Sequence, residues 1–300
     1  MQETKEQRDF ENGVRISTIW ECDGIKLGHS VSKFTELTSF SGSSQADVVR
    51  MHFGMKGDYK FTYKQLDASY DLLGGHHNIM YSKEFDITVE SKTLEIETFG
   101  IQFPVQLFIQ FTQNASDKLK RFADDVLAGK SVMLSDRWGA IDFGIQNIIQ
   151  QVIDCSYSGE LKHMFLLSKS VELLVLCADA YDHANRQETF IKNNADKEKI
   201  IAVRDIINER VIDPPSLTQI ARMVGINEFK LKKGFKETFS NTVFGYLAEQ
   251  RLYLAQRYLK DTDKTAAEIS MELGFATPQH FNNAFKKRFG VTPFTLRNNP

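Results

Sequence analysis

Residues 269–293 read ISMELGFATPQHFNNAFKKRFGVTP, and this pattern determines the fold of the C-terminal part. A short amphipathic segment leads to Gly274, where the chain must turn through a left-handed conformation that glycine tolerates. Thr277 can cap the next helix, and Pro278 occupies the favoured first helical position. Apolar residues then recur at helical spacing, as Phe281, Phe285 and Phe289. A helix, a glycine turn and a capped second helix are typical of a helix-turn-helix.

The same pattern occurs a second time, 49 to 50 residues earlier in the chain. The matching positions are Ile220, Gly225, Asn227, Leu231, Phe235, Phe239 and Thr242. Residues 243–260 join the two copies as a long amphipathic helix. We expect this helix to bury Phe244, Leu247, Leu252, Ala255 and Leu259. A stiff connector of this kind can hold two recognition helices about 34 Å apart, so that both enter successive major grooves on one side of DNA.

The second copy resembles the signature of the AraC/XylS family of transcription regulators. The matching segments are 269–275, Phe281, 285–290, 292–293 and Arg297. The resemblance covers roughly 197–300. In the first copy, the segments 230–239, 242–247 and 251–252 are similar to the branch of pyochelin-type siderophore regulators. The segments 74–81 and 161–174 are similar to the sensor domain of that branch.

The resemblance implies that the chain binds double-stranded DNA through the second helix of each copy. The residues that face the bases would be Phe229, Lys232, Lys233, Gln279, His280 and Asn283. Lysine donates to guanine, glutamine and asparagine can pair with adenine, and phenylalanine can contact a thymine methyl group. Phosphate contacts, which position the protein without reading sequence, would come from Lys230, Lys236, Lys286, Lys287 and Arg288. Taken singly, each charge also fits a solvated helix face. Arg251 and Arg297 also fit a structural role at helix ends.

The N-terminal part alternates short apolar runs with turn signals and predicts a β-rich domain. The predicted strands are 14–20, 25–31, 47–53, 59–63, 77–81 and 85–99. From residue 103 the pattern becomes helical, with helices predicted at 115–128, 141–155 and 160–186. The family resemblance implies that the strands form a cupin-like β-barrel that serves as the sensor. The predicted fold class is therefore α+β and multidomain, in which the barrel and its helices precede an all-α domain with two helix-turn-helix units.

Polarity and charge divide the chain. We predict an effector-sensing and dimerisation domain at 1–186, a polar linker at 187–199 and a DNA-binding domain at 200–300. The net charge of −2 conceals an asymmetry, because residues 196–300 carry 17 basic and 12 acidic side chains and the preceding residues are acidic. A basic C-terminal part favours a polyanionic partner at that end. The predicted helix over 161–180 is apolar on nearly every face, which favours a homodimer formed through it.

The resemblance implies a small-molecule effector, and for this branch a ferric siderophore. Arg50, His52 and Tyr81 are the predicted lining residues. The histidines His52, His76 and His77 raise the alternative of a metal site, but His76 and His77 are adjacent and would point to opposite faces of a strand. Acidic ligands do not follow at a tight spacing. We therefore predict neither a metal nor a cofactor. The three cysteines lie far apart, which favours free thiols.

The sequence thus predicts a transcription activator that binds DNA, responds to an effector, works with RNA polymerase and acts in the cytoplasm. No run of eighteen apolar residues is present and the N-terminus is polar, so we expect neither a membrane span nor a signal peptide. One alternative is a metal-dependent cupin-like enzyme with an appended DNA-binding module. Another is an effector-independent DNA-binding dimer. The sequence lacks a Ser/His/Asp signature and a phosphate loop, so we predict that the chain is not an enzyme.

Overall fold

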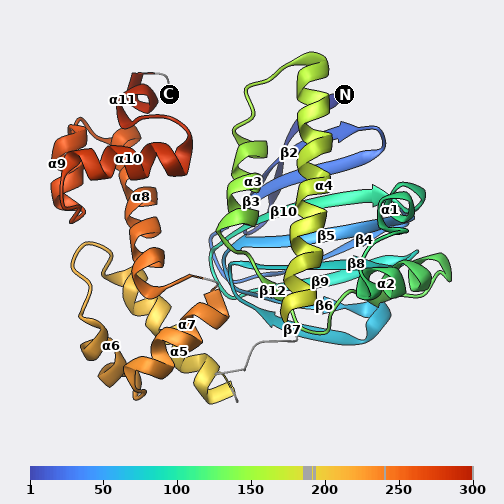
Figure 1. Cartoon of the computed structure of the whole chain (residues 1–300), viewed down its shortest axis with the longest axis horizontal. Coiled ribbons are helices and arrows are strands. Elements are labelled where there is room, and N and C mark those ends of the chain that lie inside the picture. The colour runs from blue at the N-terminus through green and yellow to red at the C-terminus, as the bar shows by residue number, and fades with distance from the viewer. Residues whose placement is uncertain (185–190, 192–193, 240, 299–300) are drawn as a thin grey trace. The chain divides into compact units, whose positions relative to one another are not determined.

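The computed structural model describes residues 1–184, 191, 194–239 and 241–298. The chain divides into two compact units, Met1–Gln187 and Glu188–Pro300. The first unit combines two antiparallel sheets with helices, and the second unit is helical (Figure 1). None of the described helices is both long and apolar enough to cross a membrane.

The first unit contains a large sheet and a small sheet. The large sheet has the order β1 (Gln2–Phe10), β2 (Gly13–Cys22), β3 (Ile25–Phe34), β10 (Glu95–Pro104), β5 (Val48–Lys56), β8 (His76–Tyr81) and β11 (Val132–Met133), with β12 (Gly139–Ala140) also paired to β8. The small sheet has the order β4 (Ser39–Ser44), β9 (Phe85–Ser91), β6 (Tyr59–Tyr63) and β7 (Ala68–Leu72).

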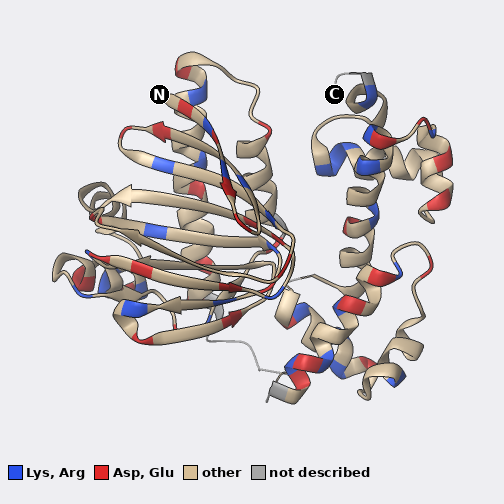
Figure 2. Ribbon diagram, turned by 180° about the vertical axis from the view of Figure 1, so that it is seen from behind, with Lys and Arg blue, Asp and Glu red and all other residues tan. Residues whose placement is uncertain are grey.

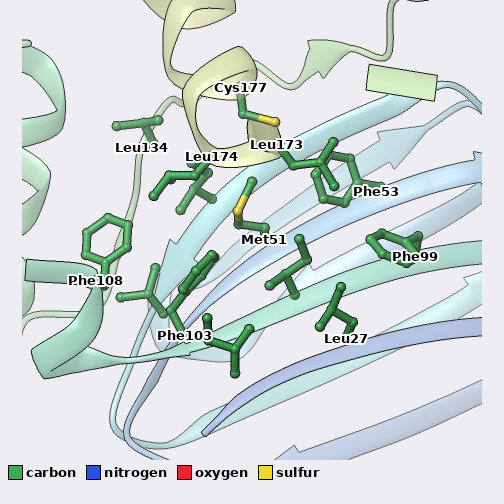
Figure 3. Close-up of a cluster of buried hydrophobic side chains, with 14 of the residues drawn as sticks. Leu27, Met51, Phe53, Phe99, Phe103, Phe108, Leu134, Leu173, Leu174 and Cys177 are labelled. Carbon is green, nitrogen blue, oxygen red and sulfur yellow. The ribbon is translucent and has the colours of Figure 1, made fainter. Parts of the chain in front are cut away.

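Helices cover one face of the large sheet. They are α1 (Val105–Thr112), α2 (Asp117–Leu127), α3 (Phe143–Ile153) and α4 (Gly159–Ala184). Successive residues of a strand point to opposite faces, so Met51 and Phe53 of β5 both face α4. Leu173, Leu174 and Cys177 of α4 pack over them in one continuous apolar core (Figure 3). Burying each such side chain contributes roughly 1.5–3 kcal/mol, which makes this core the main support of the first unit.

The opposite face of the large sheet packs against the small sheet. Tyr59 and Phe61 of β6 and Val89 of β9 meet Met80 of β8 in a second core. The strands form two sheets and do not close into the predicted cupin-like barrel. Closure requires that every edge strand is paired. Within residues 1–184, the pairing stops at β1 and at β11 and β12 in the large sheet, and at β4 and β7 in the small sheet.

The second unit contains the helices α5 (Asn194–Glu209), α6 (Leu217–Val224), α7 (Glu228–Phe239), α8 (Val243–Asp261), α9 (Ala266–Glu272), α10 (Pro278–Phe289) and α11 (Pro293–Asn298). Of the predicted linker at 187–199, residues 187–190 and 192–193 lie outside the described residues. α5 begins at Asn194, so the last part of the predicted linker is helical.

Candidate DNA-binding surface and ligand pocket

The turn between α6 and α7 has the predicted geometry. Ser216 caps α6 in a capping box with Gln219. Gly225 ends α6 in the left-handed region with φ of 67°, where a side chain would be strained. Asn227 then accepts a hydrogen bond from the backbone N–H of Lys230 at 2.8 Å, which fixes the start of α7.

The turn between α9 and α10 repeats this construction. Thr265 and Glu268 form the capping box of α9, and Gly274 has a φ of 68°. Thr277 accepts from the backbone N–H of His280 at 3.1 Å, and Pro278 is the first residue of α10. The predicted glycine turns and helix caps are therefore present at both places. Each cap contributes about 1 kcal/mol, so the two helix starts are locally encoded.

One face of α7 and one face of α10 are fixed by buried rings. On α7, Leu231 and Phe235 are inaccessible to solvent. On α10, Phe281 and Phe285 are equally buried and pack against Leu252, Ala255 and Leu259 of α8. The prediction that α8 also buries Phe244 was wrong, because this side chain is 64% exposed. Phe244 is the second residue of α8, at the very start of the helix.

Gly234 shows how closely α5 approaches α7. A Cβ atom added to Gly234 would lie 2.7 Å from Cδ1 of Ile191 and 3.0 Å from Cδ1 of Ile200. Glycine normally costs about 1 kcal/mol inside a helix compared with alanine. At this position the close packing against Ile191 and Ile200 explains why the residue is glycine.

The faces opposite these rings are polar and exposed. The predicted base-facing residues Phe229, Lys232, Lys233, Gln279, His280 and Asn283 are all exposed. So are Lys236, Lys286 and Lys287 among the predicted phosphate contacts. Lys230 is only half-exposed, and its ammonium group is 2.7 Å from Oδ1 of Asp196 on α5. Basic and acidic side chains are interspersed along the helices of this unit (Figure 2).

Arg288 does not fit the phosphate role predicted for it. Its side chain is buried against α8, where Nε lies 3.3 Å from Oε1 of Glu249. It also donates to the hydroxyl of Tyr253 and stacks on that ring at 4.9 Å. Burial raises the pKa of Glu249, whereas the Arg288 charge opposes that shift. Arg288 therefore holds α10 against α8.

Arg251 of α8 joins the two halves of the second unit. Nε and Nη2 donate to the backbone oxygens of Val211 and Ile212, which follow α5, at 3.0 and 3.2 Å. Nη1 donates to the oxygen of Gly274 at 3.1 Å. Arg297 donates to the oxygen of Lys264 in a comparable way. Sequence reasoning suggested helix-end roles for both arginines, but it contained no signal for these partners.

The three predicted effector residues are not brought together. Arg50 and His52 lie on the face of β5 that meets the small sheet, whereas Tyr81 is on the opposite face and donates to Asp47 at 2.7 Å. Burial and this contact raise the pKa of Tyr81 to about 12. The Arg50 guanidinium donates to three backbone oxygens, those of Val48, Ala46 and Ser82. Arg50 thus has a structural role.

A pocket of about 270 Å³ lies between the two sheets. Gly28 of β3 and Gly100 of β10 are paired and form part of its floor. A Cβ atom added to Gly28 would meet no atom within 4 Å. Phe61, Phe85 and Ile87 line it from the small sheet, and His52 lines it from β5. Sequence reasoning missed the glycine pair, because their cross-strand pairing is a tertiary feature.

His52 belongs to a buried hydrogen-bonded chain. Its Nε2 lies 2.7 Å from the hydroxyl of Tyr59, which lies 3.0 Å from Nε2 of His76. Burial, and to a smaller extent His76, lowers the pKa of His52 to about 3. His77 points to the other face of β8, as predicted, and contacts Tyr181 of α4. Among the described residues, groups of three His, Cys, Asp or Glu side chains that could hold a metal ion are absent.

Comparisons with known proteins cover both units. A family model described as Regulatory protein PchR N-terminal domain matches residues 15–192, and a model described as Helix-turn-helix domain matches residues 220–299. Regulatory protein PchR of Pseudomonas aeruginosa is 36% identical over 121 residues, which are 40% of this chain and 40% of that protein. Regulatory protein SoxS of Escherichia coli is 29% identical over 91 residues, covering 30% of this chain and 85% of SoxS.

A solved AraC-type DNA-binding regulator from Chromobacterium violaceum is 26% identical, with a TM-score of 0.33, and covers 35% of this chain and 95% of that chain. The alignment with PchR of Pseudomonas aeruginosa covers less than half of the length of that protein. The family model of the PchR N-terminal domain spans more than half of the chain, and the helix-turn-helix model spans most of the second unit. The chain therefore belongs to the AraC-type transcription regulators of the PchR family.

Proposed function

We propose that the chain is a sequence-specific DNA-binding transcription activator. The observation that carries this proposal is the shared design of α7 and α10. Each helix is capped at its start and buried on an aromatic face, and its opposite face is polar and exposed. α8 has 19 residues and is therefore ~28 Å long, which is close to one turn of DNA. The two helix pairs act as helix-turn-helix units in successive major grooves.

Base contacts come from Phe229, Lys232, Lys233, Gln279, His280 and Asn283. Phosphate contacts come from Lys230, Lys236, Lys286 and Lys287, of which Lys230 must leave Asp196 to reach DNA. Under this proposal residues 200–300 bind DNA, 187–199 link the domains and 1–186 sense the effector. The protein acts in the cytoplasm with RNA polymerase, and not as an enzyme.

The test is to measure binding to the DNA upstream of the chain's own gene by gel shift and footprinting. Lys232→Ala and Gln279→Ala should each weaken specific binding by roughly tenfold or more, because a lost base contact costs about 1–3 kcal/mol. Lys120→Ala, an exposed lysine of α2 in the first unit, is the matched control and should bind normally. Equal affinity of all variants for operator DNA would contradict the proposal.

The pocket between the two sheets is the proposed effector site, and a ferric siderophore is the proposed effector. Its support is the pocket of about 270 Å³ and the open space above Gly28, where an added Cβ atom meets no atom within 4 Å. Gly28→Val should fill this space without a clash and abolish the response to effector, while unliganded DNA binding is retained. Ser41→Val, on the exposed face of β4, is the control. A Gly28→Val variant with an unchanged response to ferric siderophores would exclude this pocket.

A homodimer formed through α4 is also proposed. Leu161, Met164 and Val175 of this helix are 65%, 66% and 60% exposed. They lie on one side of the helix, opposite Leu166, Leu173 and Cys177 of the core. Exposed apolar side chains at helical spacing favour association with a second helix. Light scattering should give twice the chain mass for the native protein and a lower mass for Met164→Lys. A monomer at micromolar concentration would rule out this dimer.

A further inference from the structure

The direction of each hydrogen bond in the His52–Tyr59–His76 chain can be assigned. The carbonyl oxygen of Leu73 can only accept, so Nδ1 of His76 carries a proton and donates to it. A neutral imidazole carries a single N–H, and this contact places that proton on Nδ1 of His76. Its Nε2 is then an acceptor, and the Tyr59 hydroxyl must donate to it.

The same logic fixes the proton on His52. The single proton of the Tyr59 hydroxyl is used toward His76, so the Tyr59 oxygen accepts from Nε2–H of His52. The low pKa of His52 keeps this ring neutral, so Nδ1 has a lone pair and no proton. The Phe61 ring stacks on His52 at 5.9 Å and the Trp138 ring meets it edge-on at 5.7 Å, which restrains the orientation of the imidazole.

The ring that carries this lone pair lines the pocket between the two sheets. His52 lines the pocket together with Gly28 and Gly100, which present bare backbone on the floor. Phe61 and Phe85 line it from the small sheet. Arg50 also lines it, but its guanidinium packs over Phe85 at 4.4 Å and is already used toward the backbone oxygens of Val48, Ala46 and Ser82. The remaining polar lining residues are Ser17, Lys26, Ser30 and Gln102. The pocket thus combines two aromatic rings and a bare glycine floor with the imidazole acceptor of His52, and it has polar side chains elsewhere in its lining.

We infer that this pocket selects a flat, ring-containing ligand that presents an N–H or O–H donor on its edge to Nδ1 of His52. The inference rests on the proposed function, because it takes the pocket as the effector site, and it adds the polarity of the ligand. A ligand atom that can only accept a hydrogen bond would face the lone pair and leave it unpaired. A buried polar group without a partner is unfavourable, so such ligands should bind roughly tenfold more weakly.

The tautomer is measured first, in the full chain without ligand. Nitrogen-15 NMR of histidine-labelled protein should show His52 protonated at Nε2 and unprotonated at Nδ1, with the signal assigned by its loss in His52→Gln. Tyr59→Phe removes the hydroxyl that selects this tautomer, so the His52 signal should shift towards a mixture of tautomers. A His52 ring protonated at Nδ1 in the native protein would overturn the inference.

Ligand polarity is then tested with two matched probes, indole and 1-methylindole, which differ in a donor N–H. Indole should bind roughly tenfold more tightly and shift the Nδ1 resonance of His52, in line with the loss of one buried hydrogen bond. Gly28→Val should block indole, whereas Ser41→Val should not. Equal binding of the two probes, or binding of neither, would overturn the inference. A failure to bind operator DNA in a gel shift would instead count against the proposed function.

Discussion

The guanidinium of Arg251 donates to the backbone oxygen of Gly274 at 3.1 Å, and so ties the connector helix to the turn that precedes α10. The same side chain holds the carbonyls of Val211 and Ile212 at the end of the α5 region. One residue of α8 therefore contacts both the segment before α6 and the turn between α9 and α10. The proposed function places α7 and α10 in successive major grooves, and under that proposal their separation is part of what the protein recognises.

Arg251→Gln should loosen this separation. We expect about tenfold weaker binding to an operator of native half-site spacing, in the range of one lost specific contact. The penalty for inserting one base pair between the half-sites should also become smaller. A gel-shift series over spacing variants measures both effects. Arg257→Gln, an exposed arginine on the same helix, should leave the spacing profile unchanged. A variant that loses affinity equally at every spacing would show that Arg251 has no role in setting the separation.

Two lysines of α7 should behave differently in sequence-specific binding. Lys232 is proposed to read a base, so Lys232→Ala should cost about 1–3 kcal/mol on operator DNA and less on random DNA. Lys236 is proposed to contact phosphate, so Lys236→Ala should weaken binding to operator DNA and to random DNA by a similar factor. It should also reduce the slope of log affinity against log salt concentration by about one. Fluorescence anisotropy at several salt concentrations distinguishes these outcomes. A uniform loss in Lys232→Ala would reassign it to the DNA backbone.

The buried ring of Phe285 should be a major support of the second unit. Phe285→Ala removes a fully buried side chain from the cluster with α8 and should lower the free energy of unfolding by about 3–5 kcal/mol. Phe244→Ala is the matched control, because its ring is 64% exposed, and it should change stability by less than about 0.5 kcal/mol. Circular dichroism during chemical denaturation gives both values. Similar losses in the two variants would mean that the core is assigned to the wrong face.

The contact between His163 and Asp23 should make the first unit sensitive to pH. His163 of α4 lies 2.9 Å from Asp23 in the β2–β3 turn, and this hydrogen bond, with that of Glu160, raises the pKa of the histidine above 6.5. The stabilisation that this contact gives the folded state is fully present below the pKa of histidine in the unfolded chain. It is lost as pH rises through the higher pKa that His163 has in the folded protein.

The urea midpoint of the first unit should therefore fall between about pH 5.5 and about pH 8 by more in the native chain than in His163→Gln. Trp20 and Trp138 are the two tryptophans of the chain and both lie in this unit, so their fluorescence reports its unfolding. Parallel pH profiles for the two proteins would show that the contact between His163 and Asp23 does not make the stability of this unit depend on pH.

The helical unit was largely predictable because its rules are local. Gly225 and Gly274 mark turns that require a left-handed residue, and the phenylalanine spacing of α10 defines a buried face within twelve residues. Arg288 shows the limit of this reasoning. Its neighbours Lys286 and Lys287 are exposed, and it is Glu249, far away in sequence, that draws Arg288 into the interface with α8. A single sequence contains no local signal for such a pairing.

The β-rich unit was less predictable for the same reason. β1 is polar at nearly every position and β4 reads SFSGSS, so neither shows the alternation that marks a half-buried strand. Both are edge strands whose backbones pair while most side chains remain in water. Whether the sheets close into a barrel depends on pairing between distant edges. The opposite orientations of His76 and His77 follow from strand geometry alone and were predicted.

The most direct test of the central claim is a DNase I footprint of the purified chain on the DNA upstream of its own gene. We predict two protected tracts about one helical turn apart. Lys232→Ala should lose protection mainly in one tract, and Gln279→Ala mainly in the other. Protection that is unchanged in both variants, or that disappears uniformly in both, would contradict the claim that α7 and α10 read DNA as a pair.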